Sequence, residues 1–332
     1  MQTMTEQIRT RALELGFSKV GIARAENLPI EHDRLQQWLT RGYHGEMKWM
    51  ERDTAQRADP RRFWPQARSI VVVAMNYYTP HEHRTGSRLG VSAASDSDRI
   101  KNASDIDSAT GKVSRYAWGD DYHEIVGDKL RELLSWIKAQ WPAAEGKICV
   151  DIQPVMDKAW AARAGLGWIG KHTNLITNEF GSWVFIGELL LNLNLDADEL
   201  EVADQCGSCS LCLDACPTNA LNEPYVLDAN LCISHATIES RAPEIRQEVA
   251  AHLEDWLYGC DICQDVCPWN QMTPASAEDR FQPRDGNVNA SLSEIETLNQ
   301  DAYALRFRGS AMKRAKLSGL QRNARALRQI EG

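Results

Sequence analysis

The sequence predicts an α+β fold: a body of mixed helices and strands, then a small cysteine-rich domain, then a helical and basic end. Helix-type and strand-type hydrophobic patterns alternate through residues 1–203. Eight of the nine cysteines lie between residues 206 and 267. From residue 301 onward there are eight basic and two acidic residues, a local charge of +6 in a chain of net charge −9. We therefore expect a body (1–203), a cysteine-rich domain (204–272) and a C-terminal segment (273–332).

The first part of the body combines helices with strands. An amphipathic helix near residues 4–15 precedes the strand-like segment 18–23, and a helical stretch over 30–50 precedes the buried strand 69–76. Residues 81–112 are polar, rich in Ser, Asp and Gly, and contain no aromatic residue. That composition predicts a long, mobile surface loop.

The second part of the body continues the same alternation. We expect a helix over about 121–140, a strand over 147–152, a helix over 154–164, a glycine-broken turn over 164–171 and a strand over 182–191. The composition, 43% hydrophobic and 25% charged, is ordinary for a soluble protein. No apolar run reaches the roughly 18 residues of a membrane span, and the N-terminus lacks the pattern of a signal peptide. These features predict a cytoplasmic protein with no membrane association.

The cysteines form two related motifs that predict iron–sulfur clusters. The first has the spacing of bacterial ferredoxins, in which three thiolates hold one [4Fe–4S] cluster and the fourth reaches a second cluster. The second ends in the same way but takes one thiolate from upstream. The crossover rule predicts one cluster on Cys206, Cys209, Cys212 and Cys267, and another on Cys216, Cys232, Cys260 and Cys263. Paired Cys-x2-Cys motifs also build zinc sites, but zinc sites rarely repeat this run. The ninth cysteine, Cys149, is expected to be a small buried hydrophobe.

The basic end of the chain is compatible with two interpretations. Its basic residues are Arg306, Arg308, Lys313, Arg314, Lys316, Arg322, Arg325 and Arg328. A local basic patch on an acidic body can dock one nucleic acid at one place. The alternative is a solvated basic helix.

Several blocks of the sequence resemble the epoxyqueuosine reductases, and the resemblance covers nearly the whole chain. The blocks are RADP (57–60), VVVAMNYYTP (71–80), SRYAWGDDYH (114–123), VDIQP (150–154), AWAARAGLGWIGKHTNLI (159–176), CISHATIE (232–239) and YGCDICQDVCPWN (258–270). The resemblance implies a nitroreductase-like body that binds cobalamin. It also implies reduction of epoxyqueuosine to queuosine at the wobble position of tRNA, the final step of queuosine biosynthesis. A monomer and an electron donor such as a flavodoxin or ferredoxin are further expectations.

The implied reaction needs a proton donor as well as electrons. Removal of an epoxide oxygen to leave an alkene consumes two electrons and two protons, whereas clusters deliver electrons singly, so a two-electron cofactor is required between clusters and substrate. Asp151 matches the family's catalytic aspartate and is the expected proton donor, which would require a raised pKa. The alternative is that Asp151 caps a helix beginning near Pro154.

Other residues are expected at the cofactor from the resemblance and from their chemistry. Cobalamin carries many amides and a phosphate, so polar donors on loops would hold it. The candidates are Arg57, Asp121, Asp151, Lys171, His172 and Thr173. His123 lies in a context similar to the signature by which other cobalamin proteins place histidine on cobalt, although here it opens a helix.

Two rival functions share parts of this pattern. A reductive dehalogenase would combine the same cofactors but usually carries an export signal. A simple electron-transfer protein would leave Asp151 and the body motifs unexplained.

Overall fold

The computed structural model describes residues 2–83, 109–198 and 202–331. The body contains a four-stranded antiparallel sheet in the order β1 (Lys19–Arg24), β2 (Ser69–Asn76), β7 (Val184–Leu191) and β4 (Gly146–Cys149). All eight residues of β2 are buried because both faces of the sheet are covered. On one face lie α1 (Met4–Glu14) and α5 (Tyr122–Gln140), and on the other lies α6 (Asp157–Arg163).

The first strands and helix agree with the sequence prediction, but the helix expected over 30–50 is shorter. Helix α2 (Pro29–Thr40) ends where Gly42 and Gly45 take positive φ values of 69° and 58°. Such angles interrupt a right-handed helix and are easily reached only by glycine. Short helical elements follow: a 3-10 turn (Lys48–Glu51), α3 (Thr54–Ala58) and α4 (Pro60–Phe63).

The loop expected over 81–112 is only partly within the described residues, since 84–108 lie outside them. Its last residues were assigned wrongly, because Thr110–Val113 form strand β3. Strand β3 pairs with β8 (Trp256–Tyr258) and β9 (Asn289–Ser291) in a second sheet. Partners from distant parts of the chain therefore make a strand of a segment whose composition alone predicts none.

Between β4 and α6 the chain runs through turns rather than regular structure. The strand expected over 147–152 ends at Cys149, and the helix expected from residue 154 begins at Asp157. Asp151 has a φ of 59°, which neither strand nor helix allows. The glycine-rich turn expected over 164–171 contains β5 (Trp168–Ile169), which pairs with β6 (Leu175–Ile176).

Apart from the short strand β8, the cysteine-rich segment contains short helices, as its sequence predicts. They are α7 (Leu211–Asp214), α8 (Ile233–Ile238), α9 (Gln247–Ala250) and α10 (Ile262–Asp265), followed by the 3-10 turns Pro268–Asn270 and Asp279–Phe281. The basic end is helical: α11 (Leu292–Thr297), α12 (Gln300–Arg306), a 3-10 turn (Ala311–Ala315) and α13 (Lys316–Glu331).

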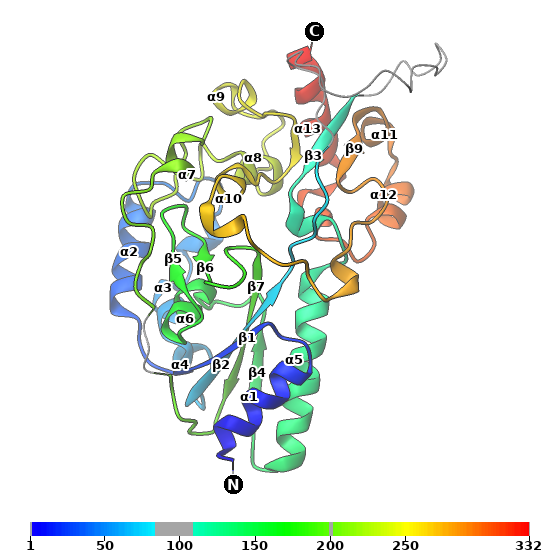
Figure 1. Cartoon of the computed structure of the whole chain (residues 1–332). Helices are drawn as coiled ribbons and strands as arrows, with labels where there is room; N and C mark the ends of the chain where they lie inside the picture. The colour runs from blue at the N-terminus through cyan, green and yellow to red at the C-terminus, as the bar shows by residue number, and fades with distance from the viewer. Residues whose placement is uncertain (1, 84–108, 199–201, 332) are drawn as a thin grey trace.

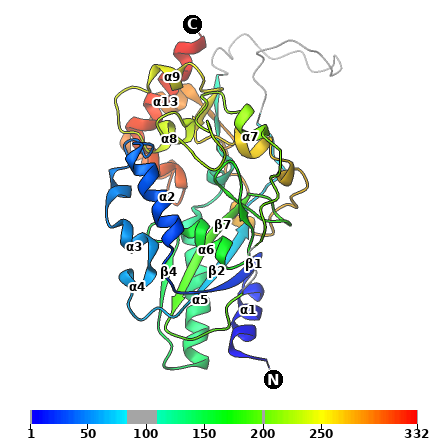
Figure 2. The ribbon, with the colours of Figure 1, turned by 90° about the vertical axis from the view of Figure 1, so that its left-hand side faces the viewer.

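A second hydrophobic core joins the end of the chain to the rest of the molecule. It includes Val113 of β3, Leu257 of β8, Ile233 of α8, Leu292 of α11 and Leu320 of α13. Helices α1 and α13 lie at opposite ends of the molecule, as the two perpendicular views show (Figures 1 and 2). Within the described ranges, no helix is both long and apolar enough to cross a membrane.

Candidate active site

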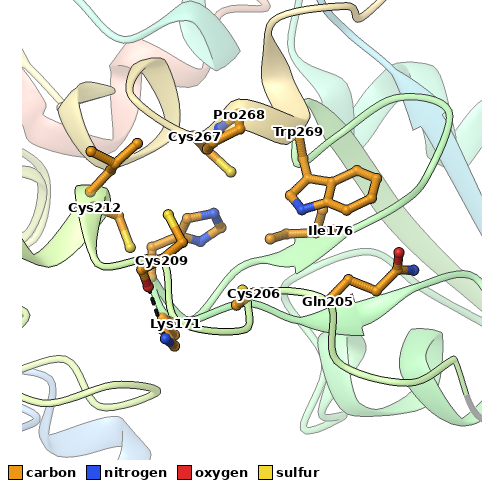
Figure 3. Close-up of a pocket in the computed structure, with 11 residues that line it drawn as sticks. Lys171, Ile176, Gln205, Cys206, Cys209, Cys212, Cys267, Pro268 and Trp269 are labelled. Atoms are coloured by element: carbon orange, nitrogen blue, oxygen red, sulfur yellow. Dashed lines mark hydrogen bonds between the residues drawn. The ribbon is translucent and has the colours of Figure 1, made fainter.

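The structure gathers four of the eight domain cysteines around one cavity. The cavity has a volume of about 270 Å³, and its lining includes Cys206, Cys209, Cys212 and Cys267. Figure 3 shows these sulfurs with the indole of Trp269 beside them. Trp269 stacks edge-on against Trp168 at 4.9 Å between ring centroids, which closes one side of the cavity with apolar surface. Residues some sixty positions apart thus meet, which the crossover rule requires.

The other four domain cysteines form a second group. Burial raises the pKa of the Cys263 thiol, and the neighbouring thiols of Cys232 and Cys216 raise it further. Burial likewise raises the pKa of Cys260, whose nearest charged neighbours include Cys263 and Cys232. The first four cysteines thus line one cavity, while the assignment of all eight to two clusters stays a prediction. Cys149 is fully buried in the body sheet, apart from both sets.

Two residues expected at cobalamin lie instead beside the first cysteine group. The Lys171 ammonium donates to the carbonyls of Gly207 at 2.6 Å and Cys209 at 2.8 Å, so it fixes the cysteine loop. His172 is 3% exposed and lines the same cavity. Burial lowers the pKa of His172 to about 4, so its imidazole is neutral near pH 7.

Thr173 connects this turn to the body. Its carbonyl accepts a hydrogen bond from the Lys158 ammonium of α6 at 2.8 Å. Thr173 has a φ of 68°, so the turn is sharply bent at that position. Thr173 thus links the turn to α6 through its backbone.

Asp151 lies in a hydrogen-bonded network with the start of α5, which we call the Asp151 network (Asp121, Tyr122, His123 and Asp151). The Tyr122 hydroxyl donates to Asp151 Oδ2 at 2.6 Å, and His123 Nε2 lies 3.5 Å from the same oxygen. His123 Nδ1 lies 2.7 Å from Asp121 Oδ1. Asp121 also caps α5 by accepting from the His123 backbone N–H. The imidazole is therefore held between two carboxylates, with both ring nitrogens engaged.

This arrangement bears on two alternatives weighed for Asp151 and His123. Helix α6 begins at Asp157 with Met156 at its N-cap, so Asp151 does not cap it. In this structure both ring nitrogens of His123 face carboxylates, Nδ1 that of Asp121 and Nε2 that of Asp151; whether His123 approaches cobalt stays an open expectation.

The electrostatics of the network differ from the expectation of a raised aspartate pKa. Burial disfavours a charged His123, but its hydrogen bonds to Asp121 and Asp151 outweigh burial and raise the pKa of His123 to about 9. Burial would raise the pKa of Asp151, but hydrogen bonds from His123 and Tyr122 lower it below the ordinary value. Near pH 7 the proton of this pair therefore resides on the imidazole and the aspartate is ionised.

Arg57 lies in α3, outside the Asp151 network. Its guanidinium stacks on Trp49 at 5.3 Å and donates to the Trp49 carbonyl at 3.3 Å. Burial lowers the pKa of Arg57, and the charge of Asp157 opposes that effect. Its buried Nε has no hydrogen-bond partner among the described residues. Arg57 thus faces Asp157 and retains a donor for a ligand.

Two acids that sequence reasoning missed lie under the Asp151 loop: Asp157 and Glu188, which we call the acid pair. Glu188 is fully buried in β7, and neither of its carboxylate oxygens has a hydrogen-bond partner among the described residues. Burial raises the pKa of Glu188 well above its ordinary value, and the charge of Asp157, at the start of α6, raises it further. A signal was present in the sequence, because a glutamate in the middle of the apolar strand VFIGELLL is unusual for a buried position.

The basic end divides into paired, buried and exposed residues. Arg306, Arg314 and Arg328 form ion pairs with glutamates. The remaining exposed basic residues, without an ion pair to the described part of the chain, are Arg308, Lys313, Lys316 and Arg325. The expectation that Arg322 is a surface charge is wrong. It is 5% exposed and donates to the carbonyls of residues 236, 240 and 242, joining α13 to α8.

Comparisons with known proteins agree with both parts of this geometry. The family model "Epoxyqueuosine reductase QueG, DUF1730" matches residues 57–152, which contain Asp121, His123 and Asp151. The family model "4Fe-4S double cluster binding domain" matches residues 205–270, which contain all eight domain cysteines. The residues 205–270 are therefore a double-cluster iron–sulfur domain.

The following curated relatives and solved structures are named epoxyqueuosine reductases. A Synechocystis epoxyqueuosine reductase is 43% identical over 295 residues, which cover 88% of this chain and 93% of the relative. A Gloeobacter violaceus epoxyqueuosine reductase is 42% identical and covers 98% of this chain and 96% of the relative. An epoxyqueuosine reductase structure with an epoxyqueuosine-modified tRNA-Tyr stem loop has a TM-score of 0.85 at 29% identity, covering 98% of this chain and 81% of that one. The Streptococcus thermophilus enzyme gives 0.84 at 27% identity, covering 98% and 80%.

Proposed function

This chain belongs to the epoxyqueuosine reductase family, and we propose that it reduces epoxyqueuosine to queuosine at the wobble position of tRNA. The observation that carries the proposal is the Asp151 network, a proton-bearing imidazole held against an exposed aspartate in a chain that also has a double-cluster domain. Removal of an epoxide oxygen needs two electrons and two protons. The double-cluster domain would deliver the electrons, and the Asp151 network would deliver protons.

The electrons are proposed to pass through clusters on the two cysteine groups. Cys206, Cys209, Cys212 and Cys267 would hold one cluster, and Cys216, Cys232, Cys260 and Cys263 the other. The crossover of Cys267 and Cys216 brings the two groups close, since Cys212 contributes to the electrostatic environment of Cys263. The first reductant would be a low-potential carrier protein such as a flavodoxin or ferredoxin.

Cobalamin is the proposed cofactor between the clusters and the nucleoside, and the chain offers groups that fit it. Ile152, next to Asp151, is 76% exposed, which suits coverage by a large flat ligand with apolar edges. Arg57 has a free buried Nε for an amide or phosphate oxygen. When bound, cobalamin would supply a reduced, nucleophilic cobalt centre. Lys171 and His172, in contrast, are proposed to serve the first cluster, because that is what they contact.

The proton is proposed to travel from His123 through Asp151 to the departing oxygen. His123 is protonated near pH 7, and its Nε2 lies 3.5 Å from the exposed Asp151 carboxylate. Tyr122 donates to the same oxygen and keeps the carboxylate pointed toward the imidazole. Asp151 would then give the proton to the substrate. Asp121 would stabilise the His123 imidazolium, which protonates Asp151.

An anaerobic turnover assay tests the function directly. Protein with reconstituted clusters would be incubated with cobalamin, a low-potential reductant and tRNA bearing epoxyqueuosine, and the digested nucleosides measured by mass spectrometry. The expected product is a nucleoside lighter by one oxygen that forms only with cobalamin present. Unchanged nucleoside, from protein shown to hold both clusters and cobalamin, would overturn the proposal.

A further inference from the structure

His172 has one ring nitrogen that the polypeptide leaves without a partner. The side chain is 3% exposed and belongs to the lining of the cavity formed by the first cysteine group. Its Nε2 is buried, and no oxygen, nitrogen or sulfur atom of the described residues forms a hydrogen bond with it. Buried polar groups in proteins are nearly always hydrogen-bonded. This nitrogen therefore indicates a partner that the polypeptide does not provide.

The other ring nitrogen of His172 determines which tautomer is present. His172 Nδ1 accepts a hydrogen bond from the backbone N–H of Asn174 at 3.2 Å. A ring nitrogen that accepts a hydrogen bond carries no proton, so the proton of this imidazole lies on Nε2. Nε2 is therefore an N–H donor and has no lone pair with which to bind iron.

The turn between β5 and β6 holds the imidazole in this orientation. The N–H of Gly170 donates to the carbonyl of Asn174 at 2.9 Å, and the N–H of Thr173 donates to the carbonyl of Gly170 at 2.8 Å. Glycine at position 170 leaves room for the ring, because a Cβ there would lie 3.3 Å from His172 Cε1 and 2.4 Å from Ile176 Cδ1. The donor thus has a fixed place on a short, hydrogen-bonded hairpin.

Two other polar side chains of the cavity lining are already engaged. Lys171 donates to two backbone carbonyls of the cysteine loop, and Gln205 donates to Asn178 Oδ1 at 3.1 Å. His172, in contrast, keeps its donor for whatever fills the cavity. A cluster on the four cysteines of this cavity would bring inorganic sulfide and thiolate sulfurs, and both accept hydrogen bonds from N–H groups.

We propose that the Nε2–H of His172 donates a hydrogen bond to a sulfur of the first cluster and thereby raises the reduction potential of that cluster. The inference rests on the proposed cluster on the first cysteine group and deepens its role in electron transfer. An added electron makes the cluster sulfurs more negative, so an N–H donor stabilises the reduced state more than the oxidised state. Lys171 and His172 thus serve the cluster differently: Lys171 holds the cysteine loop, and His172 sets the potential.

Two substitutions of His172 separate the hydrogen bond from the packing of the ring. His172→Gln keeps an N–H donor, whereas His172→Leu keeps a side chain of similar size and has no donor. Cluster-loaded protein without cobalamin or tRNA would be titrated with a reductant, and the reduced clusters followed by electron paramagnetic resonance. The signal that persists when Cys263→Ala removes the second cluster belongs to the first.

The two variants should differ in the midpoint potential of the first cluster alone. In the Leu variant the ratio of reduced to oxidised first cluster at a fixed potential should fall about tenfold, the factor for one lost hydrogen bond, which lowers the midpoint by about 59 mV. In the Gln variant that ratio should stay within about twofold of the unsubstituted protein. The second cluster is the internal reference, and its midpoint should be the same in all three proteins.

A spectroscopic measurement on the unsubstituted protein tests the contact itself. With ¹⁵N-labelled histidine, pulsed electron paramagnetic resonance of the reduced clusters should show a weak ¹⁵N coupling that is absent in His172→Gln. A strong coupling, as from a nitrogen bound to iron, or no coupling at all would overturn the proposal. So would a first-cluster midpoint that is unchanged in the Leu variant. If that variant does not hold the cluster, the ¹⁵N coupling alone decides.

These measurements need no turnover, so their failure is distinct from failure of the proposed function. Unchanged nucleoside in the turnover assay, from protein with the expected midpoints and ¹⁵N coupling, would refute the reductase activity and leave the role of His172 standing.

Discussion

The cysteine domain and the Asp151 network are built in opposite ways. In the cysteine domain, short helices and turns carry the proposed ligands, whose spacing is visible in the sequence. One long-range contact brings Cys267 to the first group, and the second set needs Cys216 and Cys232 to join Cys260 and Cys263. The residues of the Asp151 network and the acid pair come from α5 and its N-cap, the loop after β4, α6 and β7. The first region encodes its chemistry locally, whereas in the second the chemistry depends on how distant elements pack.

The largest effect is expected in the locally encoded region. Cys263→Ala removes one thiolate from the second cysteine group, so that cluster should be lost and the iron content should fall by about half. Turnover should become undetectable because the electron path is interrupted. Iron and sulfide analysis with the visible absorption spectrum would measure the loss.

The ninth cysteine supplies the matched control for that experiment. Cys149 is fully buried in β4 and belongs to neither cysteine group, so Cys149→Ala should keep the full iron content. Equal iron content in the Cys263 and Cys149 variants would contradict the assignment of Cys263 as a ligand.

The next largest effect is expected at the centre of the Asp151 network. Asp151→Asn keeps the shape and the hydrogen bond from Tyr122 but cannot carry a proton between His123 and substrate. We expect turnover to fall by about 10² to 10⁴, the usual contribution of a positioned acid. Cluster content and cobalamin binding should be unchanged, as followed by absorption spectra. Retained turnover in this variant would exclude Asp151 as the proton donor.

The pH dependence should report the imidazole of the network. The pKa of His123 is raised to about 9, so the imidazolium is present below that pH and is lost as the pH rises through it. Single-turnover rates should therefore fall above about pH 9. The fall should be no steeper in Asp151→Asn, because that variant has no carboxylate at position 151 to receive a proton from His123. His123→Gln should abolish the alkaline fall and lower the rate near pH 7 by about tenfold or more. An alkaline fall that persists in His123→Gln would assign it to another group.

The contrast between the two regions also explains what the sequence could predict. The partition of the cysteines followed from spacing, because ferredoxin-type ligation is set by a few consecutive residues. The strands β1, β2 and β7 followed from their apolar runs. The start of α6 did not, because the chain before it runs through turns, including the left-handed residue Asp151, that no hydrophobic pattern marks.

Electrostatic details were the least predictable from sequence. The pKa of Asp151 was expected to be raised, but the positions of Tyr122 and His123 around it are a result of packing and lower it. Strand β3 likewise depends on β8 and β9, which come more than a hundred residues later. In each case the deciding contact joins residues that no local pattern connects.

The basic end of the chain provides a stability test with a smaller expected effect on activity. Arg322 is buried and donates to three carbonyls at the junction of α13 and α8, so Arg322→Met leaves those acceptors unpaired. We expect a loss of about 3 kcal/mol in the free energy of unfolding. Denaturant unfolding of the cluster-loaded protein would measure it. A loss below about 1 kcal/mol would show that these hydrogen bonds contribute little.

The smallest effect is expected at Arg325, an exposed arginine one turn farther along the same helix. Its charge has no ion pair within the described part of the chain, so it is free to meet a phosphate. Arg325→Glu should weaken tRNA binding a few-fold at about 0.1 M salt and reduce the slope of log affinity against log salt by roughly one to two. Unfolding free energy should stay within about 0.5 kcal/mol of the unsubstituted protein, unlike that of the Arg322 variant. If the affinity is unchanged at every salt concentration, then α13 is a solvated basic face and tRNA binds elsewhere. If the salt slope falls as expected, the two arginines have separate roles: Arg322 anchors α13 to α8, and Arg325 contacts the nucleic acid.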